Sequence, residues 1–149
     1  MAKWNIPLIL KRMLEVLMVL GPLFMISLFF IFRLDSPTVS QLFPGEWITF
    51  TFVEVCGVFC WFILLMLQRL LTTVIKKSPF VYENVKFLKY ISYLCAMAAL
   101  VLLIKSFVDF SVMTPIVAIL ALLSSMFCQT LAMVFDKAIR IKDENDLTI

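Results

Sequence analysis

One acidic residue, Glu54, interrupts an otherwise apolar part of the chain. It follows Trp47 by seven positions, which is roughly 10 Å along a helix. A carboxylate at that depth in lipid must be paired, neutral or hydrated. Lys105 lies at a similar depth in a later apolar run, so we predict an intramembrane polar pair of Glu54 and Lys105, with Asp109 close enough to share the lysine. Two alternatives stay open: Glu54 senses or conducts a proton, or it meets water near the outer surface.

The other residue types offer little for catalysis. The chain has no histidine, which is the commonest general base and transition-metal ligand. It also lacks paired aspartates within an apolar run and a glycine-rich phosphate loop. The cysteines all lie in apolar runs without metal-site spacing, and we expect packing roles for Cys56, Cys60, Cys95 and Cys128. We therefore expect no catalytic residue, no metal site, no cofactor and no enzymatic activity.

The elements that position these residues are predicted to be membrane-spanning helices. Hydrophobic residues make up 63% of the 149 positions and charged residues 15%, against roughly 45–50% and about 25% in soluble domains. The mean hydropathy is +1.06. A soluble domain of this length has too small an interior for so much apolar surface. The pattern predicts an all-α integral membrane four-helix bundle, with spans at about 13–32, 47–75, 87–110 and 114–135.

The basic residues predict the direction of the spans, because lysine and arginine are enriched in cytoplasmic loops. Only Arg33 and Lys105 lie at the ends that would face outward. The others lie before the first span, around the second connection or after the fourth span: Lys3, Lys11, Arg12, Arg69, Lys76, Lys77, Lys86, Lys89, Lys137, Arg140 and Lys142. We therefore expect one transmembrane domain over 1–149 in the cytoplasmic membrane, both termini in the cytoplasm, and a cytoplasmic tail over 136–149.

Small residues predict how the helices pack. In lipid, helices associate through close contact and polar groups rather than through the hydrophobic effect. Two stripes of small residues at helical spacing are expected to face each other: Ser92, Ala96, Ala99 and Ser106 in the third span, and Ala118, Ala121, Ser125, Cys128 and Ala132 in the fourth. In the first span, Gly21 and Pro22 predict a kink, because proline lacks a backbone N–H.

Two helix ends are predicted on the cytoplasmic side. Pro79 ends the second span, and a new helix starts within 79–84 and runs into the third span. The fourth helix is expected to continue through Lys142, with Asp136 and Arg140 forming a weak ion pair at four-residue spacing. The residues after Lys142 are expected to be either a frayed terminus or a docking peptide.

Two of these cytoplasmic segments carry a family resemblance. The first is Ser78–Phe80 followed by Glu83–Val85 and a basic helix, and the second is Phe135–Ile149. Together with Leu67–Leu71, they resemble the bacterial membrane proteins of domain-of-unknown-function family 2975 (DUF2975). The resemblance covers the whole chain and implies a four-span protein of a bacterial membrane. Members of that family are commonly paired with a small helix-turn-helix regulator of transcription, so it also implies such a cytoplasmic partner.

We therefore expect a membrane-embedded regulatory protein that binds or sequesters this regulator in response to a membrane signal, without itself contacting nucleic acid. Its acidic end would suit a basic DNA-binding surface. The predicted docking residues are Pro79, Phe80, Glu83, Asn84, Asp143, Glu144, Asn145, Asp146 and Leu147. The alternative is a small transporter subunit or an immunity or resistance protein of the membrane, in which a homo-oligomer would form the path.

Overall fold

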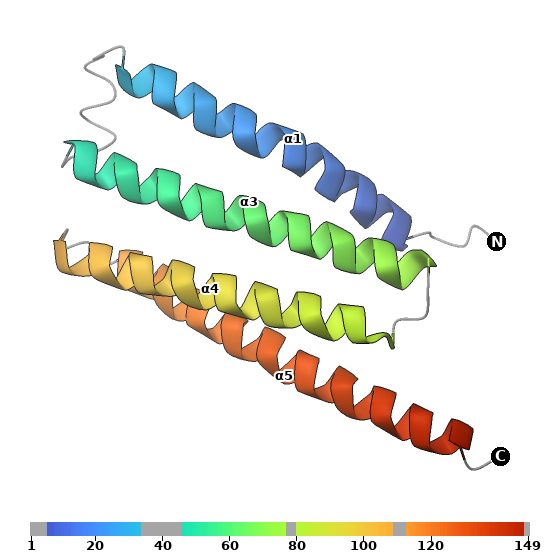
Figure 1. The fold of residues 1–149 in the computed structure, drawn as a ribbon. Coiled ribbons are helices and arrows are strands. Elements are labelled where there is room, and N and C mark those ends of the chain that lie inside the picture. Colours follow the sequence, from blue (N-terminus) through green and yellow to red (C-terminus); the bar gives the residue numbers. More distant parts are fainter. Residues whose placement is uncertain (1–5, 34–45, 77–79, 109–112, 148–149) are drawn as a thin grey trace.

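The computed structural model describes residues 6–33, 46–76, 80–108 and 113–147, all of them helical apart from 80 and 81. The helices are α1 (Ile6–Arg33), α3 (Glu46–Lys76), α4 (Tyr82–Val108) and α5 (Met113–Leu147) (Figure 1). The predicted all-α class and the number of spans are confirmed. Asp109, at the end of the third predicted span, lies outside the described residues.

Each helix is long and apolar enough to cross a membrane, over Leu8–Ile31, Thr49–Lys76, Tyr82–Val108 and Met113–Asn145. Most of their large apolar side chains are exposed rather than packed inside the protein. Since no soluble protein leaves so much apolar surface facing water, these faces are built for lipid contact. The first helix begins earlier than predicted, at Ile6, and the fourth ends later, at Leu147 rather than near Lys142.

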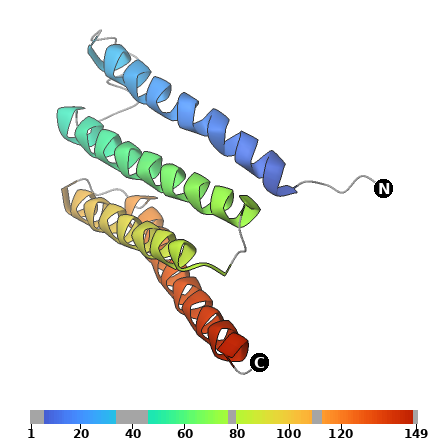
Figure 2. The same cartoon turned by 45° about the vertical axis from the view of Figure 1, so that its right-hand side comes forward.

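The helices form an open row rather than a closed bundle. The main packing interfaces join α1 to α3, α3 to α4 and α4 to α5, so each helix packs chiefly on its neighbours in sequence. Figures 1 and 2 show α1 at one side of the row and α5 at the other. Successive helices run antiparallel, so the start of α1 and the end of α5 lie at the same end of the molecule (Figure 1).

The α4–α5 pair is the most closely packed part, and it confirms that the two predicted stripes face each other. Ser92 Oγ donates to the Ser125 carbonyl at 2.9 Å, and Ser125 Oγ donates to the Ser92 carbonyl at 2.9 Å. Four buried residues of α5 lie seven positions apart, at Ala118, Ser125, Ala132 and Ile139. In this antiparallel register Ala99 stands level with Ala118, and both are 0% exposed. Small side chains let the two backbones approach closely.

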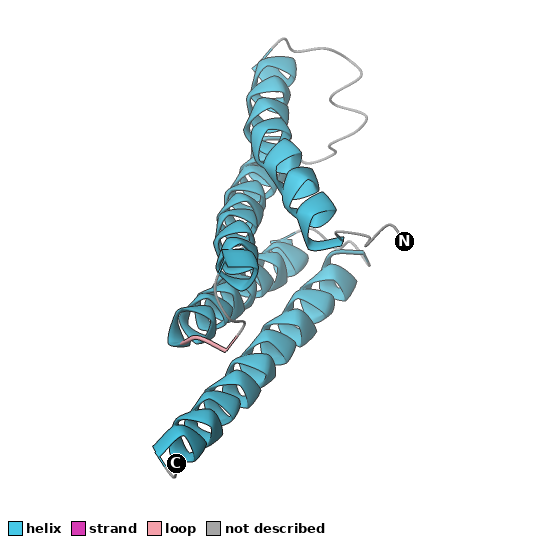
Figure 3. Ribbon diagram, turned by 90° about the vertical axis from the view of Figure 1, so that its right-hand side faces the viewer, coloured by secondary structure: helices cyan, strands magenta, loops and turns pink. Residues whose placement is uncertain are grey.

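The predicted kink in α1 has a specific consequence for its contact with α3. Pro22 lies inside the helix, and α1 bends along its length (Figure 3). Proline has no N–H, so the carbonyl four residues earlier, on Met18, loses its donor within the helix. Trp61 of α3 supplies a replacement, because its indole Nε1–H donates to the Met18 carbonyl at 3.4 Å. This bond therefore ties α1 to α3 at the proline.

The last helix is longer than a bilayer requires. Its 35 residues extend about 50 Å at about 1.5 Å per residue, whereas the hydrocarbon core is about 30 Å thick. No charged residue interrupts it before Asp136. The segment from Asp136 to Leu147 continues α5 as a regular helix, and the helix is long enough for this charged end to extend beyond the hydrocarbon.

Candidate functional site

The projecting end of α5 forms a groove with the residue that precedes α4. We call this the terminal groove; it has a volume of about 470 Å³ and is lined by Phe80, Ala138, Ile141, Lys142 and Asn145. Phe80 and Ile141 are both about half exposed, at 44% and 50%. The two segments that carried the family resemblance, 58 positions apart between Phe80 and Ala138, thus line one surface.

An apolar cluster holds the terminal groove in place. Val85 and Leu88 of α4 pack with Ala132 and Ile139 of α5, and Leu70 of α3 packs against the same cluster. Phe80 meets Phe135 edge to face, with ring centroids 5.8 Å apart and an interplanar angle of 66°. An aromatic pair of this kind adds about 0.5–1.5 kcal/mol to area burial. Phe80 is therefore anchored on one side and open to solvent on the other.

The start of α4 agrees with the predicted helix start within 79–84. The backbone N–H of Asn84 donates to the Val81 carbonyl at 2.9 Å, and the first helical residue is Tyr82. The Asn84 side chain is only 1% exposed, so it lies inside the packing between helices. Burial to this degree does not fit the direct partner contact that the sequence predicted for Asn84.

The other predicted docking residues are distributed as follows. Phe80 and Asn145 line the terminal groove, and Glu83, Asp143 and Glu144 are exposed near it on α4 and α5. Asp146 and Leu147 belong to α5, but their side chains are not among those described, and Pro79 lies outside the described residues. The predicted ion pair on α5 is confirmed, with Arg140 Nη2 3.1 Å from Asp136 Oδ2.

Replacing Phe80 with alanine is expected to lower the free energy of local opening at the start of α4 by about 1–2 kcal/mol. The reason is that the ring pair with Phe135 and its buried area are both lost. Hydrogen exchange of the amides of residues 84–88 measures this opening. Tyr82→Ala is the control, since Tyr82 is 49% exposed and should change the exchange rate little. Equal effects of the two substitutions would contradict the anchoring role of Phe80.

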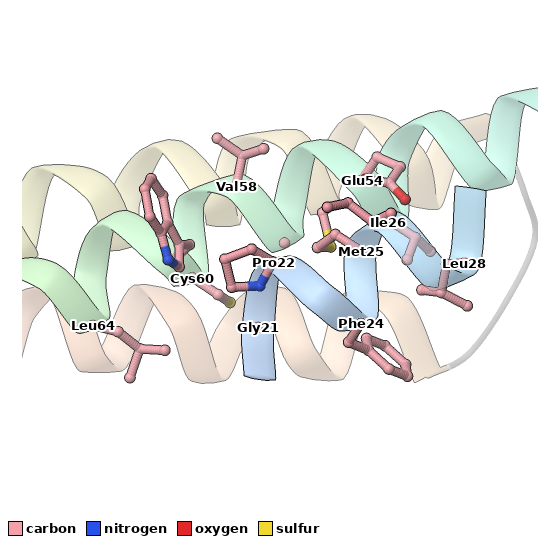
Figure 4. Close-up of a pocket in the computed structure, with 13 residues that line it drawn as sticks. Gly21, Pro22, Phe24, Met25, Ile26, Leu28, Glu54, Val58, Cys60 and Leu64 are labelled. Atoms are coloured by element: carbon pink, nitrogen blue, oxygen red, sulfur yellow. The ribbon is translucent and has the colours of Figure 1, made fainter. Parts of the chain in front are cut away.

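A second cavity lies between α1 and α3, and we call it the α1–α3 pocket. Its volume is about 470 Å³. It is lined by Gly21, Pro22, Phe24, Met25, Ile26, Leu28, Val53, Glu54, Gly57, Val58, Cys60, Trp61 and Leu64. Glu54 is the one ionisable acid among them, and Figure 4 shows its side chain extending from α3 toward Ile26 of α1.

Glu54 and Lys105 lie on α3 and α4, two helices that pack on each other. Glu54 lines the α1–α3 pocket, and its Oε1 is buried without a hydrogen-bond partner among the described residues. Direct pairing of Glu54 with Lys105 therefore stays a prediction.

The cysteines are all free thiols. Among them, Cys95 of α4 is buried and Cys60 of α3 is exposed. Within the described ranges, no group of three or more histidine, cysteine, aspartate or glutamate side chains is placed to hold a metal ion.

The sequence reasoning missed three residues of the α1–α3 pocket. Met25 packs directly on Gly57, which leaves no room for a side chain at that position unless Met25 moves. Trp61 bonds the Met18 carbonyl and also lines the pocket. Pro22 was the available signal, since a proline inside a membrane helix implies a carbonyl four residues earlier that needs an outside donor.

Four antiparallel helices, each long and apolar enough to cross a membrane, define a multi-pass α-helical membrane protein. Residues 12–149 match the family described as protein of unknown function DUF2975, and the chain belongs to that family. The family resemblance seen in residues 78–85 and 135–149 is thereby confirmed. No curated protein and no solved structure matches the chain.

Proposed function

We propose that this chain is a regulatory protein of the bacterial cytoplasmic membrane that binds a small helix-turn-helix regulator of transcription at the terminal groove. The observation that carries the proposal is the meeting of Phe80 with the projecting end of α5. The segment around Phe80 and the end of α5 are the parts by which the sequence resembles its family. Members of that family are commonly paired with such a regulator. A soluble partner can reach a groove that lies outside the hydrocarbon.

The proposed orientation places the terminal groove in the cytoplasm. The start of α1, the end of α3, the start of α4 and the end of α5 lie at one end of the molecule (Figure 1). That end carries most of the lysine and arginine of the described residues, while Arg33 and Lys105 lie toward the other. The preference of basic residues for the cytoplasmic side supports this direction.

The order of charges along the end of α5 supports a basic partner. Lys137, Arg140 and Lys142 come first and lie close to the anionic lipid surface, which attracts them. Asp143 and Glu144 follow and lie farther from the bilayer. A DNA-binding surface is basic because it must contact phosphates, so carboxylates at this position can compete with DNA for it. Phe80 and Ile141 supply the apolar contact beside these charges.

Co-purification tests this proposal. The full chain, solubilised from its native membrane in mild detergent, is expected to retain a small helix-turn-helix protein, and a chain ending after Lys142 is expected to lose it. With that protein purified, Asp143→Ala, Glu144→Ala and Asp146→Ala together should weaken its binding by about tenfold. The loss should shrink as salt is raised, because exposed charges are screened.

Glu15→Ala is the matched control, since it removes an exposed carboxylate from the same end of the molecule but from α1. It should leave partner binding unchanged. Retention of no DNA-binding protein by the full chain, or equal retention by the full and shortened chains, would sink the partner proposal.

A further inference from the structure

The α1–α3 pocket is large enough for a small organic molecule and has a single carboxyl group in its lining. Its volume of about 470 Å³ lies within the range of about 300–1,000 Å³ that holds small organic molecules. Its walls are otherwise apolar and aromatic. Into this cavity Glu54 extends from α3 (Figure 4), with Oε1 buried and no hydrogen-bond partner among the described residues.

The chemistry of the lining selects the kind of molecule. A carboxylate within a bilayer must be paired, neutral or hydrated, and a cation in the pocket would pair it. Trp61 and Phe24 line the same cavity, and the faces of aromatic rings attract cations. The remaining apolar wall suits an apolar body. An anion would be repelled by Glu54, and an uncharged apolar molecule would leave the carboxyl group unpaired.

We propose that the α1–α3 pocket is a binding site for a lipophilic organic cation. Glu54 pairs with the positive charge, and the apolar and aromatic wall, which includes Trp61, holds the body of the molecule. The ligand enters from the bilayer, because α1 exposes its large apolar side chains along its length. The site is formed by α1 and α3 alone, so it does not depend on the partner proposed for the terminal groove.

Tetraphenylphosphonium, an apolar cation, is the probe, and tetraphenylborate, an anion of nearly the same shape, is its counterpart. The full chain is reconstituted in nanodiscs of zwitterionic phosphatidylcholine, and binding of each ion is measured by equilibrium dialysis against empty nanodiscs. The expected result is saturable binding of the cation at one site per chain. Tetraphenylborate should neither bind saturably nor displace the cation.

Two substitutions locate the binding. Glu54→Gln keeps the shape of the side chain and removes its charge, so cation binding should weaken by about tenfold or more. Gly57→Leu adds a side chain to the pocket wall at the place where Met25 now packs, so it should also weaken binding. Glu15→Gln, which neutralises an exposed carboxylate of α1 outside the pocket, should bind like the unmodified chain. Unchanged helical circular dichroism of Glu54→Gln shows that any loss reflects the site and not the fold.

Three outcomes would overturn the proposal. The first is the absence of saturable cation binding, and the second is equal binding by the Glu54→Gln variant or equal binding of the anion. The third is that the chain forms a dimer that does not bind the cation, and that Gly57→Leu converts this dimer to a monomer. That result would mean that a second copy of the chain occupies the pocket.

Discussion

Replacing Ser125 with leucine is expected to lower the free energy of unfolding by about 2–4 kcal/mol. Ser125 is 9% exposed and stands where α4 and α5 approach closely. Leucine there adds volume to a packed seam, which costs about 1–3 kcal/mol. It also removes the hydrogen bond that the Ser125 hydroxyl donates to the Ser92 carbonyl, and such a bond contributes about 0.6 kcal/mol in membrane proteins. We expect this to be the largest single effect in the molecule.

The neighbouring serine offers a matched control. Ser124 is exposed, and its hydroxyl bonds only the Leu120 carbonyl of its own helix at 2.8 Å. Ser124→Leu adds the same volume toward lipid and should change the free energy of unfolding by less than about 0.5 kcal/mol. The rate of Cys95 labelling by a thiol reagent in detergent reports the opening of α4 from α5, because Cys95 is buried. Similar labelling rates in the two variants would contradict the assigned seam.

Trp61→Phe is expected to lower the free energy of unfolding by about 1–2 kcal/mol, the second largest effect. The substitution retains an aromatic ring but removes the donor that bonds the Met18 carbonyl. Since Pro22 supplies no N–H, that carbonyl would be left unsatisfied inside the membrane, at a cost of about 1–3 kcal/mol. The bond is long, at 3.4 Å, so we expect the lower part of this range. The change in the free energy of unfolding is measured by denaturation in a graded series of detergent mixtures.

A double-mutant cycle with Pro22→Ala isolates this bond. Alanine restores an N–H at position 22, which can bond the Met18 carbonyl within α1. Trp61→Phe should therefore cost less than half as much in the Pro22→Ala chain as in the unmodified one. An equal cost in both backgrounds would mean that Trp61 stabilises the protein through ring packing alone.

Several properties follow from local sequence and needed no knowledge of the tertiary structure. Hydropathy sets the number of helices, because a stretch of about 20 apolar residues stays helical in lipid whatever surrounds it. The α4–α5 seam was also predictable, since Ser92, Ser125 and their small neighbours recur at helical spacing and a short connection makes the helices antiparallel. The start of α4 near Tyr82 followed from Pro79.

The tertiary structure decided which faces meet. The seven positions between Trp47 and Glu54 give a distance along α3, but they say nothing about rotation. Successive positions differ by about 100° around a helix, and the structure turns Glu54 toward α1, where it lines the α1–α3 pocket. Likewise, only the packing of α4 on α5 buries Asn84 and leaves Phe80 half open at the terminal groove. Hydropathy is a property of each segment, whereas a pocket or groove depends on the relative rotation of two segments, which the contacts between them determine.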